Sequence, residues 1–246
     1  MIYLITGANR GLGEGLAAAY LSRPNNTVIA AVRNPEHLTS KALHDLPRAQ
    51  SSNLIVVKID SKSETDAKMA VRDLISTHNI SAVDIVIANA GIAKVLPTVA
   101  QAQVSDMLEH FMVNAVAPAL LFQAFLPLLR KSQREPKFVT LSTTAASIAD
   151  MEQVPIPNAA YGPSKAALNY LTKKIHVENP DIIAFPISPG WVQTDMGNDG
   201  ARKVGLESAD ITIEQSITGL LDVIENATRE ASSGKFLSYD GDSCGW

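Results

Sequence analysis

The sequence predicts an α/β fold, a doubly wound parallel sheet with helices on both faces. Short β-like apolar runs alternate along the chain with longer segments whose apolar residues recur at helical spacing. Most of the β-like runs are apolar on both faces, as expected for strands of a parallel sheet that helices cover. The chain has 246 residues, 46% of them hydrophobic, which is enough for a large core. We therefore expect a single domain over residues 1–246.

The elements follow from these runs in chain order. The predicted strands are Ile2–Ile5, Thr27–Val32, Leu54–Ile59, Val83–Ala88, Lys137–Ser142, Ile182–Ile187 and Lys235–Ser238. A first helix follows the first strand, since Leu12, Leu16, Ala19 and Tyr20 recur at helical spacing. Further helices are predicted near Ser63–His78, Val104–Lys131, Ser164–Val177 and Ile213–Glu230. Ligands of such sheets bind beyond the carboxyl ends of the strands, so the residues after each strand are the most informative.

The first strand ends in a glycine-rich turn within YLITGANRGLGEGLAAAYL. Gly7, Gly11 and Gly13 stand between the apolar run and the helix. A backbone without Cβ atoms lets an anion approach closely, and the dipole of the following helix favours that anion. The turn is therefore interpreted as a phosphate cradle, with an ordinary tight strand-to-helix turn as the alternative. Its spacing, G-x-x-x-G-x-G, differs from the G-x-G-x-x-G dinucleotide fingerprint.

The next three strand ends indicate where the rest of a dinucleotide would bind. Arg33 follows the second strand, where an acidic residue would favour NAD and an arginine favours a 2′-phosphate. Arg10 in the glycine turn is a second candidate for that phosphate, although either arginine could be an ordinary surface charge. Asp60 could accept a hydrogen bond from an adenine amine or cap the following helix. Asn89, Ala90 and Gly91 leave room for a flat ligand, or form a plain turn.

The fifth strand and the helix after it contain the residues suited to catalysis. FVTLSTTAASI supplies hydroxyl groups, Ser142 and Thr143 among them. In AAYGPSKAALNYL, Tyr161 and Lys165 are four residues apart and share one face at the start of a helix. A nearby cation favours ionised tyrosine, whose pKa is normally about 10, and so suits proton transfer. The alternative is a core tyrosine beside a surface lysine.

Composition excludes several classes of function. The net charge is −4 and no basic cluster suggests a nucleic-acid partner. No apolar run approaches the roughly 20 residues that span a bilayer, so we expect no membrane partner and a cytoplasmic location. The single cysteine, Cys244, excludes an internal disulfide. The five histidines lack metal-ligand spacing, and we expect no metal.

Six motifs occur together in an order that resembles a known family over essentially the whole chain. They are TGANRGLG, NAG, the asparagine of VNAVAP, the serine/threonine strand end, YGPSK and SPGWVQTDM. Together they resemble the classical short-chain dehydrogenase/reductase family, which has a Rossmann-type fold. The stretches NAVAPALLFQAFLPLLRK, PGWVQTDMG and GKFLSYDGDSCGW are similar to its carbonyl-reductase branch. That branch includes the insect sniffer protein, bacterial C-factor-like proteins and fungal norsolorinic-acid-type ketoreductases.

The resemblance implies NADP(H) as cofactor and a site made of matching positions. Gly7, Gly11 and Gly13 would hold the pyrophosphate and Arg10 with Arg33 the 2′-phosphate. The other implied cofactor contacts are Asn9, Leu12, Asp60, Asn89, Ala90, Gly91, Tyr161, Lys165, Pro189, Gly190, Val192 and Thr194. The implied activity is NADPH-dependent reduction of a ketone or aldehyde, possible substrates being aromatic or polyketide-type ketones. Tyr161 would be the general acid, Lys165 would bind the nicotinamide ribose and depress the tyrosine pKa, and Asn114 would support a water-linked proton relay.

Two positions depart from the family pattern. Thr143 falls where the family has a substrate-positioning serine, and Ser142 falls one residue earlier, so either could be the catalytic hydroxyl. Successive side chains of a strand point to opposite faces, so only one of the two can reach the substrate, and the count favours Thr143. The segment ADMEQVPIPN, with its two prolines, lengthens the gap before Tyr161 and could border the substrate.

Three further questions stay open. A non-catalytic NADP-binding regulatory protein and a sugar-nucleotide epimerase or dehydratase are alternative functions, because fold alone does not determine function. The resemblance is compatible with a homodimer through the helices at Val104–Lys131 and Ser164–Val177, and with a monomer. Asp195–Ile211 is predicted to be a short lid over the site, with Gly197, Gly200 and Gly205 giving it mobility.

Overall fold

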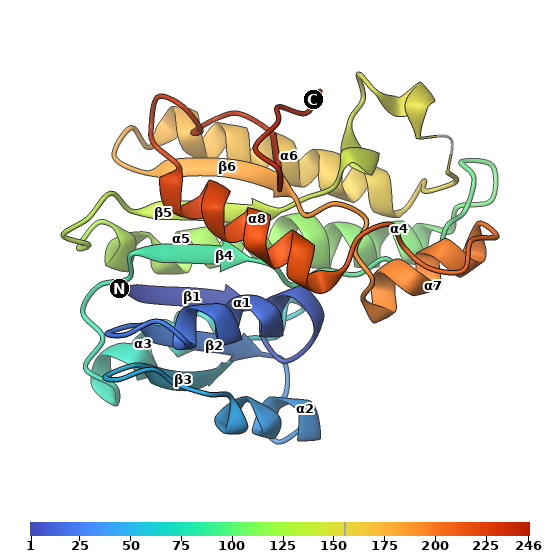
Figure 1. Ribbon diagram of the computed structural model, residues 1–246. Helices are drawn as coiled ribbons and strands as arrows, with labels where there is room; N and C mark the ends of the chain where they lie inside the picture. Colours follow the sequence, from blue (N-terminus) through green and yellow to red (C-terminus); the bar gives the residue numbers. More distant parts are fainter. Residues whose placement is uncertain (155) are drawn as a thin grey trace.

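A parallel sheet of seven strands forms the centre of the molecule. The computed structural model describes residues 1–154 and 156–246. The strands are β1 (Ile2–Thr6), β2 (Thr27–Val32), β3 (Asn53–Lys58), β4 (Ile85–Ala88), β5 (Lys137–Leu141), β6 (Ile183–Ser188) and β7 (Leu237–Ser238). Their order across the sheet is β3-β2-β1-β4-β5-β6-β7, and neighbouring strands pair in parallel (Figure 1). The doubly wound α/β prediction is therefore confirmed, with strand bounds shifted by a few residues.

Helices cover both faces of this sheet. They are α1 (Gly11–Leu21), α2 (Leu38–Lys41), α3 (Asp66–Ser76), α4 (Val104–Phe111), α5 (Ala117–Leu129), α6 (Tyr161–Glu178), α7 (Asp195–Lys203) and α8 (Ile213–Asn226). Helices α1 and α8 pack on one face, and α3, α5 and α6 supply buried residues to the other. The two short helices α2 and α7 were not predicted as helices from the sequence. Pro155, one of the two prolines in the predicted substrate-bordering segment, lies outside the described residues.

The predicted helix Val104–Lys131 is a rod with a wider turn in its middle. Helices α4 and α5 are continuous through a π-helical turn at Met112–Val116. By length and composition alone the rod, Val104–Leu129, could span a bilayer, which differs from the expectation that no apolar run is long enough. Leu121, Phe125 and Leu128 belong to the buried cluster against the sheet. The apolar residues of α5 are therefore accounted for by the core.

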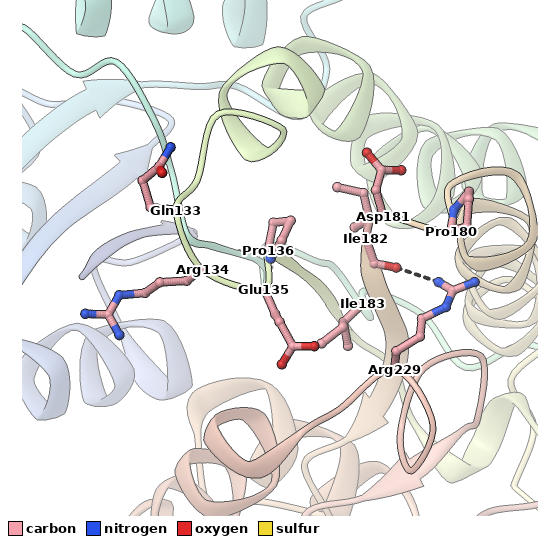
Figure 2. A pocket seen from close by; sticks show the side chains of 9 residues that line it. All are labelled: Gln133, Arg134, Glu135, Pro136, Pro180, Asp181, Ile182, Ile183 and Arg229. Carbon is pink, nitrogen blue, oxygen red and sulfur yellow. Dashed lines mark hydrogen bonds between the residues drawn. The ribbon is translucent and has the colours of Figure 1, made fainter.

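A surface cavity opens at the amino ends of β5 and β6 (Figure 2). Pro136 and Ile183 line it, together with Arg229 from beyond α8. The guanidinium of Arg229 donates to the carbonyl oxygens of Ile182 at 2.6 Å and of His176 at 2.8 Å. It thus satisfies the His176 carbonyl in the last turn of α6, which otherwise lacks an intrahelical partner. This cavity lies at the opposite edge of the sheet from the carboxyl ends of the strands.

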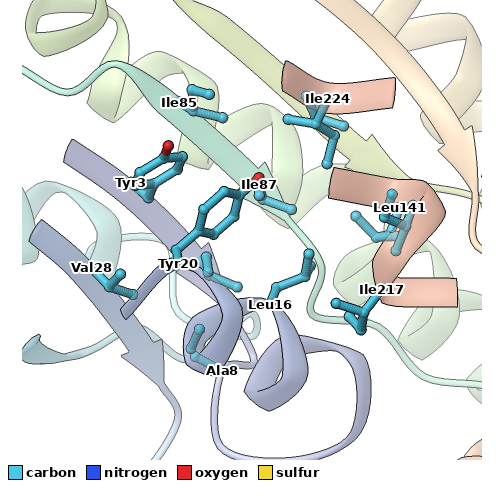
Figure 3. Close-up of a cluster of buried hydrophobic side chains, with 14 of the residues drawn as sticks. Tyr3, Ala8, Leu16, Tyr20, Val28, Ile85, Ile87, Leu141, Ile217 and Ile224 are labelled. Atoms are coloured by element: carbon cyan, nitrogen blue, oxygen red, sulfur yellow. The ribbon is translucent and has the colours of Figure 1, made fainter. Parts of the chain in front are cut away.

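The core under α1 and α8 fixes the start of the glycine turn. Tyr3 of β1 and Tyr20 of α1 stack with ring centroids 3.9 Å apart, and Leu16 and Ile217 lie in the same cluster (Figure 3). Such aromatic pairs add roughly 0.5–1.5 kcal/mol beyond the burial of their area. Because β1 and α1 are held together in this way, the turn between them, from Thr6 to Gly11, has a fixed shape.

Candidate active site

The glycine turn has the geometry that an anion cradle requires. Gly7 and Gly11 have φ angles of +62° and +54°, a region that disfavours residues with a side chain. A Cβ at Gly13 would stand 2.2 Å from the carbonyl oxygen of Gly7, so only glycine fits there. Arg10 precedes α1 without a side-chain cap, which leaves the first N–H groups of the helix available. These features fit the pyrophosphate of a dinucleotide.

Asn89 holds this turn in place. Its Nδ2 donates to the carbonyl oxygens of Thr6, at 2.8 Å, and Gly7, at 3.3 Å. Its backbone N–H and that of Ala90 both donate to the Thr6 hydroxyl at 3.0 Å. Asn89 therefore connects the ends of β1 and β4. Of the two interpretations of this strand end, a ligand contact and a structural turn, the contacts account for the structural one.

One exposed arginine lies in the glycine turn and a second follows β2. Arg10 and Arg33 are both exposed, and no ion pair to a carboxylate involves either guanidinium in the described ranges 1–154 and 156–246. Asn9 donates from its Nδ2 to the Thr39 hydroxyl of α2 at 2.6 Å, which ties the turn to the segment after β2. Two guanidinium groups without a carboxylate partner can bind a phosphate.

Asp60 lies beside a small cavity between the ends of β1, β3 and β4. Ala88, Ala90 and Leu121 are among the residues that line it with Asp60. The Asp60 Oδ1 accepts the backbone N–H of Lys62 at 2.9 Å, which shapes the turn after β3. The carboxylate at the start of α3 is instead that of Asp66. Small residues, Ala88 and Ala90 among them, form part of the lining of this cavity.

Thr143, Tyr161 and Lys165 meet at the carboxyl ends of β5 and β6. Tyr161 and Lys165 occupy the first and second turns of α6, as the four-residue spacing predicts. Burial raises the pKa of Tyr161 to about 12, whereas a lowering by Lys165 was expected; the neighbouring Thr143 hydroxyl opposes this rise. Burial lowers the pKa of Lys165 to about 8. Its ammonium donates to the carbonyl oxygen of Leu141 at 2.6 Å, which fixes it at the end of β5.

The two hydroxyls after β5 have different environments. Ser142 is 3% exposed, and its Oγ donates to Oδ1 of Asn169 at 2.5 Å. Thr143 is half-buried, lies next to Tyr161, and accepts the backbone N–H of Ala145 at 3.2 Å. The two side chains therefore point to different sides, as strand alternation predicts. Thr143 is the one beside the candidate proton donor.

Asn114 lies in the π-helical turn of the rod and reaches the segment after β4. Its Oδ1 accepts the N–H of Ile92 at 2.9 Å, and its Nδ2 donates to the Ile92 carbonyl at 2.9 Å. The same Nδ2 donates to the Ser164 hydroxyl at 3.0 Å, which in turn donates to the Tyr161 carbonyl at 2.6 Å. Both amide hydrogens of Asn114 are thus in use. Ser164, which was not predicted as a site residue, joins this network to Tyr161.

Gly91 completes the contact between the strand end and the catalytic group. A Cβ on this residue would stand 3.2 Å from Oδ1 of Asn114 and 3.4 Å from the Lys165 ammonium. A side chain there would crowd both groups. Of the three residues predicted after β4, Asn89, Ala90 and Gly91, it is therefore Gly91 that lies beside the catalytic cluster.

The segment after β6 leads from the sheet back to the glycine turn. Pro189 accepts the Ser216 hydroxyl at 2.6 Å, and Gly190 has a φ angle of +81°. Val192 is buried and pairs with Ile211. Thr194 caps α7 and lies against the glycine turn, because a Cβ on Gly11 would stand 3.3 Å from the Thr194 methyl. These positions surround the space in front of the glycine turn.

The predicted lid is a short helix that is tied to its neighbours. Helix α7 fills most of Asp195–Ile211, and the Lys203 ammonium donates to the Lys94 carbonyl at 3.0 Å. A Cβ on Gly197 would stand 1.9 Å from the Val192 carbonyl oxygen, so this glycine permits close packing. The expectation that Gly197 gives the segment mobility is therefore replaced by a packing role.

The comparisons with known proteins agree with this geometry. A family model described as short chain dehydrogenase matches residues 1–204. The norsolorinic acid ketoreductase nor1 of Dothistroma septosporum is 46% identical over 247 residues, which cover 99% of this chain and 92% of that protein.

Solved carbonyl reductases share the fold over nearly the whole length. The NADPH-bound carbonyl reductase from chicken fatty liver superposes with a TM-score of 0.85 at 32% identity, over 99% of this chain and 98% of that one. The carbonyl reductase Sniffer of D. melanogaster gives a TM-score of 0.85 at 29% identity with the same coverage. This chain belongs to the short-chain dehydrogenase/reductase family, whose members are oxidoreductases that use a nicotinamide cofactor.

Proposed function

We propose that the protein is an NADPH-dependent carbonyl reductase that acts on a bulky aromatic or polyketide-type ketone. The main support is that Thr143, Tyr161 and Lys165 lie at the same edge of the sheet as the glycine turn. Hydroxyl, phenol and ammonium groups beside a dinucleotide cradle form the set that reduction of a carbonyl needs.

Two exposed guanidiniums favour NADPH over NADH. Arg33 is the residue after β2, where an acidic residue would instead select the ribose hydroxyls of NADH, and Arg10 lies in the glycine turn. A charge-assisted phosphate contact contributes about 1.5–3 kcal/mol when it is well formed. The bound cofactor supplies the hydride, and the protein supplies orientation and the proton.

The side chains divide the remaining work. Tyr161 protonates the carbonyl oxygen as negative charge develops on it, and Thr143 donates a hydrogen bond to the same oxygen. The Lys165 ammonium is fixed by the Leu141 carbonyl and binds the nicotinamide ribose. Its positive charge stabilises the phenolate that Tyr161 becomes when it gives up its proton. Because the amide hydrogens of Asn114 are both occupied, any part it takes in a proton relay does not use them.

The substrate class rests on relatives and on the rim of the site. The relatives named norsolorinic acid ketoreductase include proteins of Dothistroma septosporum and Aspergillus parasiticus, at 46% and 42% identity. Ile148 and Met151, in the segment between β5 and α6, are 70% and 60% exposed. Apolar side chains at that rim suit a flat, hydrophobic ketone.

A cofactor-oxidation assay tests this proposal. The purified protein is mixed with NADPH or NADH and with aromatic ketones, aldehydes and quinones in turn, and the loss of reduced cofactor is measured. We expect turnover of at least one aromatic ketone and a preference for NADPH. Tyr161→Phe serves as the matched inactive control. Binding of NADPH without turnover of any carbonyl compound would instead favour a regulatory dinucleotide-binding protein.

A further inference from the structure

The segment after β7 folds back across the sheet edge toward the active site. A turn after β7 lets the N–H of Ser238 donate to the Asp242 carbonyl at 2.8 Å, and Leu237 pairs with Ser243 in antiparallel sense. The N–H of Cys244 then donates to the Phe236 carbonyl at 2.8 Å. This return strand brings Gly245 and Trp246, here called the tail, to the loop that leaves β5.

The tail binds that loop through one oxygen atom. The main-chain oxygen of Trp246 accepts the N–H groups of both Ile148 and Ala149 at 2.9 Å, and the Ser147 hydroxyl lies 3.5 Å away. Two donors on a single acceptor fix the direction of the loop at this point. Gly245 makes the approach feasible, because a Cβ on it would stand 2.3 Å from Oδ2 of Asp150.

The Trp246 ring anchors the tail to the rest of the fold. It packs at a tilt on Phe236, with ring centroids 6.0 Å apart. The Lys173 ammonium of α6 lies 5.3 Å from the ring centroid, within the range of a cation–π contact. The same ammonium donates to the Gly234 carbonyl, which holds it at this place. The tail is therefore fixed to both β7 and α6.

The loop that the tail holds connects the two candidate catalytic groups. It begins at Thr143 and ends at Tyr161, the first residue of α6. Near its far end, Nδ2 of Asn158 donates to the Ala145 carbonyl at 3.2 Å. Between these points, the exposed apolar side chain of Ile148 is next to the bonds to the tail. Asn158 and the tail are thus two separate restraints on one loop.

We propose that Gly245 and Trp246 are positioning residues, which fix residues 147–150 of the loop after β5 so that they form a rigid wall for the ketone substrate. This inference rests on the proposed reductase function. Within residues 1–154 and 156–246, the tail contacts the loop after β5, Phe236 and Lys173, and not the glycine turn, so its effect should fall on the ketone and not on the cofactor. A displacement of about 1 Å at a positioning contact can cost up to ~100-fold in rate.

The test compares the full chain with a truncation after Cys244 and with Trp246→Ala, Trp246→Phe and Gly245→Ala. Tyr170→Ala, which removes an exposed aromatic ring from α6, is the matched control. Three quantities are measured on each: amide hydrogen exchange of residues 147–154, the Kd for NADPH by fluorescence, and kcat and KM for an aromatic ketone. The melting temperature identifies variants that fail to fold.

We expect the truncated protein to exchange the amides of Ile148 and Ala149 faster. Its kcat/KM for the ketone should fall by about 10- to 100-fold, with the Kd for NADPH changed less than about twofold. Trp246→Phe should retain most of the activity that Trp246→Ala loses, because it keeps an apolar ring. Gly245→Ala, which keeps the anchoring ring, should resemble the truncation.

Unchanged exchange at Ile148 and Ala149 in the truncated protein would overturn the inference, and this measurement needs no turnover. So would faster exchange together with an unchanged kcat/KM, since the loop would then be held without consequence for the substrate. A parallel loss of NADPH affinity would also overturn it, because the tail would then act on the whole fold. Failure of the unmodified protein to reduce any ketone is a separate result, which counts against the proposed function.

Discussion

Ser142→Ala and Thr143→Val should damage different properties, although the two residues are adjacent. Ser142 is 3% exposed, and its hydroxyl donates to Oδ1 of Asn169. The Nδ2 of Asn169 is buried and already lacks a hydrogen-bond partner among the residues the structure describes. Removing the hydroxyl therefore leaves the whole Asn169 amide buried without a protein partner.

The cost of Ser142→Ala follows from that geometry. A buried polar group left unsatisfied costs about 1–3 kcal/mol. For a chain of this size each kcal/mol lowers the melting temperature by roughly 2–4 °C. The catalytic cluster loses nothing directly, so kcat should stay near that of the unmodified protein. Thr143→Val should instead lower kcat by about 10²–10³-fold, the usual cost of one donor to a developing oxyanion.

The assays are urea denaturation for stability and steady-state kinetics for turnover. The control for Thr143→Val is Thr143→Ser, which keeps the donor and should remain active. The control for Ser142→Ala is the double change Ser142→Ala plus Asn169→Leu, which removes both polar partners and should recover part of the lost stability. The reverse ranking, with Ser142→Ala stable but nearly inactive and Thr143→Val fully active, would refute the reasoning and assign the catalytic hydroxyl to Ser142.

Three further predictions concern the proton donor, the cofactor and pH. Tyr161→Phe should lower the kcat of ketone reduction by about 10²–10⁴-fold while NADPH still binds in a fluorescence titration; retention of most activity would exclude Tyr161 as the acid. Arg10→Ala plus Arg33→Ala should erode the preference for NADPH mainly through KM, and equal kcat/KM values for NADPH and NADH in the unmodified protein would contradict the assignment. Burial lowers the pKa of Lys165 to about 8, so between pH 8 and its ordinary value near 10.5 the unfolded chain binds more protons. The contribution of Lys165 to the free energy of unfolding should therefore increase as pH rises through this window in the cofactor-free protein. The measurement is a pH series of denaturation curves for the unmodified protein and for Lys165→Met. The same increase in both proteins would refute this prediction.

The strand ends could be predicted from the sequence because their chemistry is local. A turn between a strand and a helix was enough to predict the role of Gly7, Gly11 and Gly13. Helical spacing was enough to predict that Tyr161 and Lys165 share one face. Strand alternation also predicted that Ser142 and Thr143 point to different sides. Alternation alone does not determine which one faces inward, because that depends on Asn169, a partner distant in the sequence.

Features that depend on distant contacts were missed or misjudged. Gly197 was predicted to give mobility, but it is required because the Val192 carbonyl approaches too closely for any Cβ. Ser164 lies within the motif YGPSK, but its role comes from hydrogen bonds to Asn114 and to the Tyr161 carbonyl, which the motif alone does not indicate. The contact between the tail and the loop after β5 joins residues 99 apart in the chain, which no local pattern can indicate.

The π-helical turn at Met112–Val116 gives the site an unusual sensitivity to chain length. One extra residue in a helical turn rotates the preceding part of the rod by about 100° relative to the part that follows. In this protein the part before the turn contacts α6, while the part after it contacts α3 and the sheet. Deleting one residue from the turn would preserve the apolar pattern of each half. It would also rotate one half about the helix axis, so that the two apolar faces no longer met their packing partners. Homologues should therefore keep the number of residues in this turn, and Asn114 within it, while the other four positions vary more freely.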